Sequence, residues 1–279
     1  MDKPDVICIT ETKLDPSTGN VTLGLKDYNI WRKDRADGNG GGVAILTKKG
    51  IIIKELEINQ DPIVEMKVIE VEINGVNIII TTVYMPPQTS AWSLENYQKL
   101  IQETIKSLEE VLQLSETNST EILITGDFNS KIDWESLDPR AQSDSWNAKL
   151  LDVINEHCLF QNVTDHTRIR GLDRPSMLDL IFTKHNDDIK DIEYCPPLGK
   201  SDHVVIKLKY CLLQEKLIVS KERKEKYNYK RGDYRSLKDF FDNINWETLL
   251  DDENLDVQYA KFCEIYKKRS GKIHTQIQN

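Results

Sequence analysis

The sequence predicts an α/β fold in which two β-sheets pack face to face and helices lie outside them. Three observations favour this fold: many short β-rich runs, few long amphipathic helices, and turn residues that join neighbouring runs as hairpins. Hydrophobic residues make up 39% and charged residues 30% of the 279 residues, which is typical of a globular protein. The chain is therefore long enough to bury a substantial core.

The N-terminal part of the sequence is rich in strand signals. Asn74-Gly75 separates two β-rich runs, and this dipeptide is a strong signal for a tight hairpin turn. The expected strands are 6–10, 28–32, 42–47, 51–58, 63–73 and 76–84.

Helical periodicity begins after this strand-rich region. Apolar residues recur every three or four positions from Leu94 to Leu112, which predicts an amphipathic helix. A second helix is expected over 145–157, with Ser143 or Asp144 near its N-terminal cap. The remaining strands are expected at 122–125, 178–182, 189–194 and 204–213.

The composition changes near residue 215, where apolar residues thin out and basic residues accumulate. We therefore predict two parts, a main domain over 1–213 and a basic linker with short helices over 214–279. The linker is either a solvated connector or a strip that contacts nucleic acid. Between residues 216 and 238 the basic residues are Lys216, Lys221, Arg223, Lys224, Lys226, Lys230, Arg231, Arg235 and Lys238.

The overall charge and the cysteines limit the class of protein. A net charge of −9 argues against a protein that only coats nucleic acid, but not against an enzyme whose carboxylates hold a cation. The five cysteines are scattered without a CxxC pair, which favours reduced thiols in the cytoplasm or nucleus. No apolar run is long enough for a membrane span, and no secretory signal is expected.

Polar residues follow several of the predicted strands. Asp127 and Asn129 come directly after the strand ILIT, and Asp179 interrupts an otherwise apolar strand. If the strands are neighbours, these groups converge on one rim of the sheets, where buried acids are either paired or functional. The full candidate set is Glu11, Tyr84, Asp127, Asn129, Asp179, Asp202 and His203.

All of these candidates except Asp202 also have a purely structural explanation. Asp127 with Asn129 fits an Asx turn, Glu11 fits a helix-start acid, and His203 fits a structural histidine. Asp179 fits a partner for an arginine, and Tyr84 fits packing at a strand end. The glycine-rich run 38–42 lacks the lysine of a phosphate loop and precedes a strand, so a loop turn is expected there.

The order of these motifs resembles a known superfamily. Glu11-Thr12, Val83-Tyr84 before Pro86, Gly126–Asn129, Leu178-Asp179 and Ser201–His203 together resemble the endonuclease/exonuclease/phosphatase superfamily, which includes deoxyribonuclease I and the abasic-site endonucleases. The resemblance covers roughly residues 1–212. The stretches DVICITETKL, GGGVAILTK and SDHVVI, with Thr167-Arg168, resemble the endonuclease domain of non-LTR (LINE-type) retrotransposons. The tail YKRGDYRSLKDFFDNINWETLL resembles the connector to the reverse transcriptase.

The resemblance implies a four-layer α/β sandwich of two mixed sheets flanked by helices, as in deoxyribonuclease I. It also implies a Mg²⁺- or Mn²⁺-dependent endonuclease that nicks target DNA, with a reverse transcriptase as partner in the full-length element. Roles follow by position. Glu11 binds the metal, Asp202 lies beside it, and Asp127 with Asn129 orients the attacking water. Tyr84 hydrogen-bonds the phosphate, and Asp179 pairs with His203. Thr167 lines the DNA-facing side.

The sequence departs from the family pattern at its start. The family begins with another strand that bears a metal-binding asparagine, whereas this sequence enters after that point with Met1-Asp2-Lys3-Pro4-Asp5. A second hypothesis is therefore a truncated, weakly active remnant that acts as a binding module. A third is a phosphatase of the same superfamily. The oligomeric state and the DNA sequence that is cut do not follow from the sequence.

Overall fold

The computed structural model of the chain divides it into two compact units, residues 1–214 and 215–279. The predicted domain boundary, most of the basic linker and part of the glycine-rich run lie outside the described residues. The residues that the structure describes are 3–35, 40–118, 120–171, 173–211, 234–251, 257–259, 261–262 and 265.

A six-stranded mixed sheet is the centre of the first unit, with strand order β4-β5-β6-β7-β9-β8. The pair β6–β7 is parallel, and the other neighbouring strands are antiparallel. Asn74 and Gly75 both have positive φ, which is the conformation of the tight hairpin turn expected between β5 and β6. The strands are β4 (Ile52–Glu55), β5 (Glu65–Ile73), β6 (Val76–Tyr84), β7 (Glu121–Asp127), β8 (Phe160–Gln161) and β9 (Asp179–Thr183).

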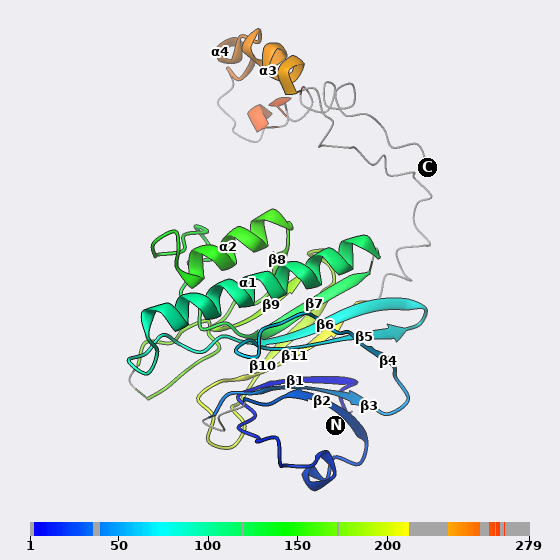
Figure 1. Cartoon of the computed structure of the whole chain (residues 1–279). Helices are drawn as coiled ribbons and strands as arrows, with labels where there is room; N and C mark the ends of the chain where they lie inside the picture. The colour runs from blue at the N-terminus through cyan, green and yellow to red at the C-terminus, as the bar shows by residue number, and fades with distance from the viewer. Residues whose placement is uncertain are drawn as a thin grey trace. The chain divides into compact units, whose positions relative to one another are not determined.

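Two smaller antiparallel sheets form a second β-layer. One is three-stranded with order β1-β3-β2, and the other is the pair β10–β11. The three-stranded sheet lies across the central sheet from the helices (Figure 1). The strands are β1 (Val6–Thr10), β2 (Tyr28–Lys33), β3 (Val43–Lys48), β10 (Ile189–Cys195) and β11 (Val205–Tyr210), and a short 3-10 helix η1 spans Asn20–Leu23.

Two helices, α1 (Leu94–Thr117) and α2 (Trp146–Glu156), cover the other face of the central sheet (Figure 1). The Ser93 hydroxyl caps α1 by accepting a hydrogen bond from the Asn96 N–H. The cap of α2 is Ser145, whose hydroxyl accepts from the Ala148 N–H. Ser143 and Asp144, which were expected near this cap, directly precede it in the chain.

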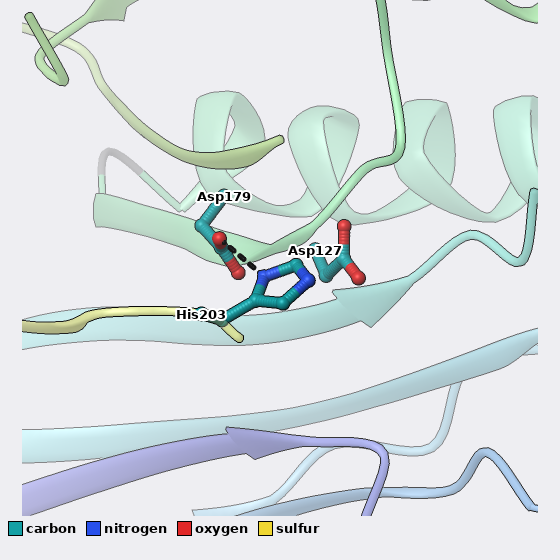
Figure 2. Close-up of side chains that lie close together, drawn as sticks. All are labelled: Asp127, Asp179 and His203. Atoms are coloured by element: carbon teal, nitrogen blue, oxygen red, sulfur yellow. Dashed lines mark hydrogen bonds and ion pairs between the residues drawn. The ribbon is translucent and has the colours of Figure 1, made fainter. Parts of the chain in front are cut away.

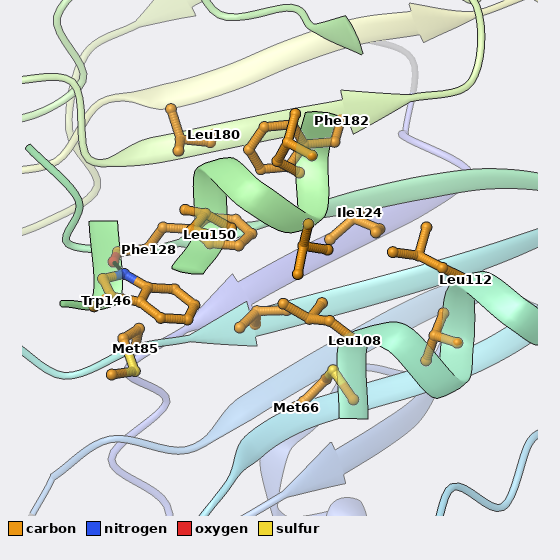
Figure 3. Packing of buried hydrophobic residues seen from close by; sticks show 14 of the residues in the cluster. Met66, Met85, Leu108, Leu112, Ile124, Phe128, Trp146, Leu150, Leu180 and Phe182 are labelled. Atoms are coloured by element: carbon orange, nitrogen blue, oxygen red, sulfur yellow. Dashed lines mark hydrogen bonds between the residues drawn. The ribbon is translucent and has the colours of Figure 1, made fainter. Parts of the chain in front are cut away.

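Strand alternation divides the core into two clusters, one on each face of the central sheet. On β7, Ile122 and Ile124 point toward the helices, while Leu123 points toward the second β-layer. We call the first cluster the helix-side core; Figure 3 shows its packing, with Phe128 stacked on Trp146 and edge-on to Phe182. We call the second the sheet-side core; its buried members are Ile45, Ile69, Val71, Ile78, Ile80, Leu123, Val163 and Ile181.

The second unit contains short helices, α3 (Tyr234–Asp242) and α4 (Trp246–Leu249). An aromatic cluster holds it together, with ring centroids 5.6 Å apart for Phe241–Trp246 and 5.8 Å apart for Trp246–Phe262. Among the described residues of the chain, no helix has both the length and the apolar character needed to cross a membrane.

Candidate active site

The strand register aligns three candidate residues at one end of the central sheet. Tyr84 at the end of β6 pairs with Asp127 on β7, and Asp127 pairs in turn with Asp179 on β9. Three neighbouring strands thus present a phenol and two carboxylates in a row. These residues lie in the rim that the strand-end pattern predicts.

The backbone around Asp127 is shaped by a glycine. Gly126 has φ +150°, and a Cβ at this position would lie 1.9 Å from the Val83 carbonyl oxygen on the adjacent strand. Glycine lets the two strands approach closely at the point where Asp127 is presented. The Asn129 N–H donates to Asp127 Oδ1 at 3.1 Å, so the Asx-turn explanation of this pair also holds. The Asn129 side-chain amide donates to Asp127 Oδ2 at 3.1 Å and to the Met85 carbonyl at 3.0 Å.

Asp179 and His203 form a close pair beside Asp127 (Figure 2). His203 Nδ1 lies 2.7 Å from Asp179 Oδ2, and the two side chains are 25% and 19% exposed. Ligand atoms of Asp127, Asp179 and His203 all lie within 4.8 Å of one another. His203 enters from the segment before β11, so the cluster joins the central sheet to the second β-layer.

The electrostatics of this cluster raise the pKa of both Asp127 and His203. Burial raises the pKa of Asp127 to about 7, and the negative charge of Asp179 adds to the increase. Burial by itself lowers the pKa of His203, but the hydrogen bond and charge of Asp179 outweigh it, and the pKa rises to about 9. The imidazole is therefore held in its charged form, with Nδ1 donating to Asp179.

Glu11 connects the second β-layer to the same rim. It follows β1 with a positive φ of 50°, and its Oε1 accepts a hydrogen bond from the Tyr84 hydroxyl at 2.7 Å. Burial alone would raise the pKa of Glu11, but the hydrogen bonds from Tyr84 and Lys13 lower it. Burial and the neighbouring Glu11 raise the pKa of Tyr84, so the phenol remains a hydrogen-bond donor.

Two predicted residues have surroundings that differ from those expected. Thr167 is 0% exposed, and its hydroxyl accepts from the backbone N–H groups of Leu178 at 3.0 Å and Asp179 at 2.9 Å. It supports the strand that bears Asp179, and its place on the DNA-facing side stays a prediction. Asp202 Oδ2 accepts from the Arg168 guanidinium Nε at 2.9 Å. The arginine partner considered for Asp179 thus belongs to Asp202, outside the close group of Asp127, Asp179 and His203.

The donor set at the rim fits a hard divalent cation. Glu11 offers a carboxylate that is 42% exposed, and Asp127 offers a second one a short distance along the rim. Carboxylate oxygens are the ligands that Mg²⁺ and Mn²⁺ prefer. A divalent cation held there would offset negative charge at the rim.

Sequence reasoning missed a partly buried ion pair next to Tyr84. Arg35 and Glu65 form this pair, and the Arg35 guanidinium carbon lies 5.9 Å from the centroid of the Tyr84 ring. The two charged residues are 30 positions apart in the chain, so no local motif joins them. The signal that points to the pair is the glycine-rich run ending at Gly42, since glycine marks a close backbone approach.

The sequence was compared with models of known protein families and with curated proteins. Residues 78–207 match the family model described as Endonuclease-reverse transcriptase. No curated protein matches the chain.

Several solved structures share the fold. The endonuclease domain of TRAS1, a telomere-specific non-LTR retrotransposon, is 15% identical with a TM-score of 0.53, and the match covers 74% of this chain and 85% of that one. The 3′-5′ exonuclease NExo from Neisseria meningitidis is 17% identical with a TM-score of 0.53, covering 74% and 89%. An AP endonuclease from Archaeoglobus fulgidus is 15% identical with a TM-score of 0.52, covering 75% and 90%. These structures confirm the predicted fold.

Proposed function

We propose that this chain is a member of the endonuclease/exonuclease/phosphatase superfamily and a divalent-metal-dependent phosphodiesterase that nicks DNA. The observation that supports this most strongly is the group formed by Asp127, Asp179 and His203, whose ligand atoms lie within 4.8 Å of one another. A proton acceptor and a charged imidazole at this spacing suit hydrolysis of a phosphate ester.

Asp127 is the proposed general base. Its pKa of about 7 makes it a competent proton acceptor near neutral pH, and Asn129 holds its carboxylate in place. Asp127 accepts the proton of the attacking water, whose oxygen forms the new bond to phosphorus as the bond to the leaving oxygen breaks. The Asn129 amide is close enough to Asp127 to help orient that water.

His203 and Tyr84 are the proposed groups that bind the phosphate. Charged His203, oriented through Nδ1 by Asp179, can donate from Nε2 to a phosphate oxygen. Tyr84 remains protonated and can donate as well. When bound at Glu11, with Asp202 proposed nearby, Mg²⁺ or Mn²⁺ would supply positive charge that neutralises the phosphate and the leaving oxygen.

DNA is the proposed substrate, and retrotransposition is the proposed context. TRAS1 is described as a telomere-specific non-LTR retrotransposon, and a structure of NExo is described as bound to a product DNA hairpin. The Endonuclease-reverse transcriptase family match makes a reverse transcriptase the proposed partner. Work on chromosomal DNA would take place in the nucleus.

The test is nicking of supercoiled plasmid by the purified chain, with Mg²⁺ and with EDTA. We expect nicked circles only with Mg²⁺ and a loss of at least about 100-fold in Asp127→Ala. Asp133→Ala is a matched control, because Asp133 follows in the same segment but pairs with Arg140 at the surface. Undiminished nicking by Asp127→Ala would contradict the proposed role of the carboxylate.

Two further substrates separate the alternatives. Release of inorganic phosphate from a 3′-phosphorylated oligonucleotide without nicking would identify a phosphatase. Binding of DNA with neither reaction would identify a binding module.

Because burial of the Asp127 charge is unfavourable, Asp127→Ala should unfold at no lower urea concentration than the parent at pH 8.

A further inference from the structure

We propose that Arg35 is a positioning residue of this site, which holds the Tyr84 ring in place and, through Tyr84, the Glu11 carboxylate. The inference rests on the proposed function and extends it to a residue and a glycine-rich run outside the expected motifs. It starts from the ion pair between Arg35 and Glu65.

The Arg35 guanidinium is held in a fixed orientation by a buried carboxylate. Arg35 Nε donates to Glu65 Oε1 at 2.8 Å, and Nη2 donates to the same oxygen. The second carboxylate oxygen, Oε2, accepts from the Gly42 backbone N–H. Glu65 is only 5% exposed, so its charge requires these partners. The fork of the guanidinium and both oxygens of the carboxylate are thus engaged together.

The glycine-rich run makes room for this pair. Gly41 has φ +67°, and a Cβ there would lie 2.3 Å from Glu65 Oε2 and 2.6 Å from the Arg35 guanidinium carbon. Only glycine permits the backbone to approach the ion pair this closely. The described part of the run thus has a more specific role than the loop turn expected from the sequence.

The same backbone segment also holds the loop that bears Glu11. The Thr12 N–H donates to the Gly42 carbonyl at 3.2 Å, and the Lys13 N–H donates to the Gly41 carbonyl at 2.8 Å. These bonds fix the two residues that follow Glu11. The ion pair and the Glu11 loop therefore share one short backbone segment.

Arg35 reaches the site through the Tyr84 ring. Glu65 lies directly opposite Tyr84 in the β5–β6 register, which places the ion pair beside the phenol. The guanidinium carbon is 5.9 Å from the ring centroid, within the range of a cation–π contact. The Tyr84 hydroxyl then donates to Glu11 at 2.7 Å. Glu11 is thus held from two sides, through its own loop and through the ring.

A positioning role and a purely structural role predict different kinetics. If Arg35 only stabilises the fold, its loss lowers stability without affecting the reaction specifically, and its effect is independent of the Tyr84 hydroxyl. If Arg35 acts through Tyr84, the two residues are coupled. Substitution of Arg35 then has almost no further effect on the nicking rate once Tyr84 has been substituted.

The experiment compares Arg35→Met with Arg32→Met. Arg32 is a suitable control because it lies on the preceding strand, is largely buried and pairs with Asp34 at 3.2 Å. Each variant is made alone and with Tyr84→Phe, and nicking of supercoiled plasmid gives kcat and KM. A second readout is the ¹³C-tyrosine NMR signal of Tyr84, which is assigned by its disappearance in Tyr84→Phe.

We expect Arg35→Met to lower kcat about 10-fold with KM changed less than about twofold, and the double variant to match Tyr84→Phe alone. Arg35→Lys should recover part of the loss, because it restores the charge without the fork. The Tyr84 signal should shift in Arg35→Met and not in Arg32→Met. The inference would be overturned if the fold-losses in kcat of the two single variants multiplied in the double variant. It would also be overturned if the Tyr84 signal did not shift in Arg35→Met. If the parent chain does not nick DNA, the proposed function fails, and the Tyr84 signal alone decides the role of Arg35.

Discussion

The two faces of the central sheet are packed differently. On the helix side, Phe128 and Phe182 are fully buried and contact each other edge-on under α1 and α2. On the other side, two separate antiparallel sheets supply many partly buried residues, such as Trp31 and Leu208. The helix-side core is one continuous packed cluster, whereas the sheet-side core is closed by two independent pieces.

The candidate site contains residues from the central sheet and from the second β-layer. Tyr84, Asp127 and Asp179 stand on the central sheet, one face of which packs on the helix-side core. Glu11 and His203 come from the second β-layer. The geometry of the site therefore depends on the alignment of one continuous sheet with a layer made of two separate sheets. Contacts that cross the layers, such as Tyr84–Glu11 and Asp179–His203, are the ones that maintain this alignment.

The largest effect should come from truncation of the helix-side core. Phe128→Ala removes a ring that stacks on Trp146, and should lower the free energy of unfolding by about 3–5 kcal/mol. Leu208→Ala on β11 should cost less, about 1–2 kcal/mol, because Leu208 is only partly buried. Urea denaturation followed by circular dichroism measures both values. Equal losses would show that the two faces are packed equally well.

A smaller effect should follow from Thr167→Val, which keeps the shape and removes the hydroxyl. The buried N–H groups of Leu178 and Asp179 then lose their acceptor, at a cost of about 1–3 kcal/mol. Thr167→Ser, which retains the hydroxyl, is the control and should lose less in the same urea titration. If Thr167→Val is as stable as the parent, the two hydrogen bonds do not support the Asp179 strand.

The smallest effect should be seen in the pH dependence of stability. His203 has a folded-state pKa of about 9, above its ordinary value of 6.5, because Asp179 stabilises the charged ring. Its contribution is fully present below pH 6.5 and is lost as the pH rises through about 9. The difference between these two pKa values sets an upper bound of about 3 kcal/mol. Because the pair is partly exposed to solvent, unfolding in EDTA should show a decline on the order of 1 kcal/mol over this window, absent in His203→Gln. An identical decline in His203→Gln would show that the Asp179 pair contributes nothing across the two layers.

Local signals in the sequence located most of the elements and much of the rim. They did not indicate β8 or η1, and β4 is shorter than the expected strand 51–58. The Asn74-Gly75 hairpin formed as expected, and Asp127 emerged at the end of a buried strand because Gly126 allows the close approach to Val83. The motif order also indicated the fold that the solved structures confirm. These features depend on neighbouring residues, so a local pattern predicts them.

The remaining features depend on contacts between distant segments. Thr167 lies in a polar stretch, yet it is buried because the β9 strand needs an acceptor for two N–H groups. The Arg35–Glu65 pair joins a loop to a strand through a glycine-rich segment, and no periodicity encodes it. Strand order and the division of the second β-layer likewise arise from pairing between distant strands.

The most direct test of the account is the rate of Mg²⁺-dependent nicking when one residue is changed in each layer. Asp127→Ala alters the central sheet, and Glu11→Gln alters the second β-layer without changing the size of the side chain. If the site is a phosphodiesterase built across both layers, each variant should lose at least about 100-fold in rate, while Asp133→Ala nicks like the parent. Nicking at the parental rate by either site variant would contradict the account.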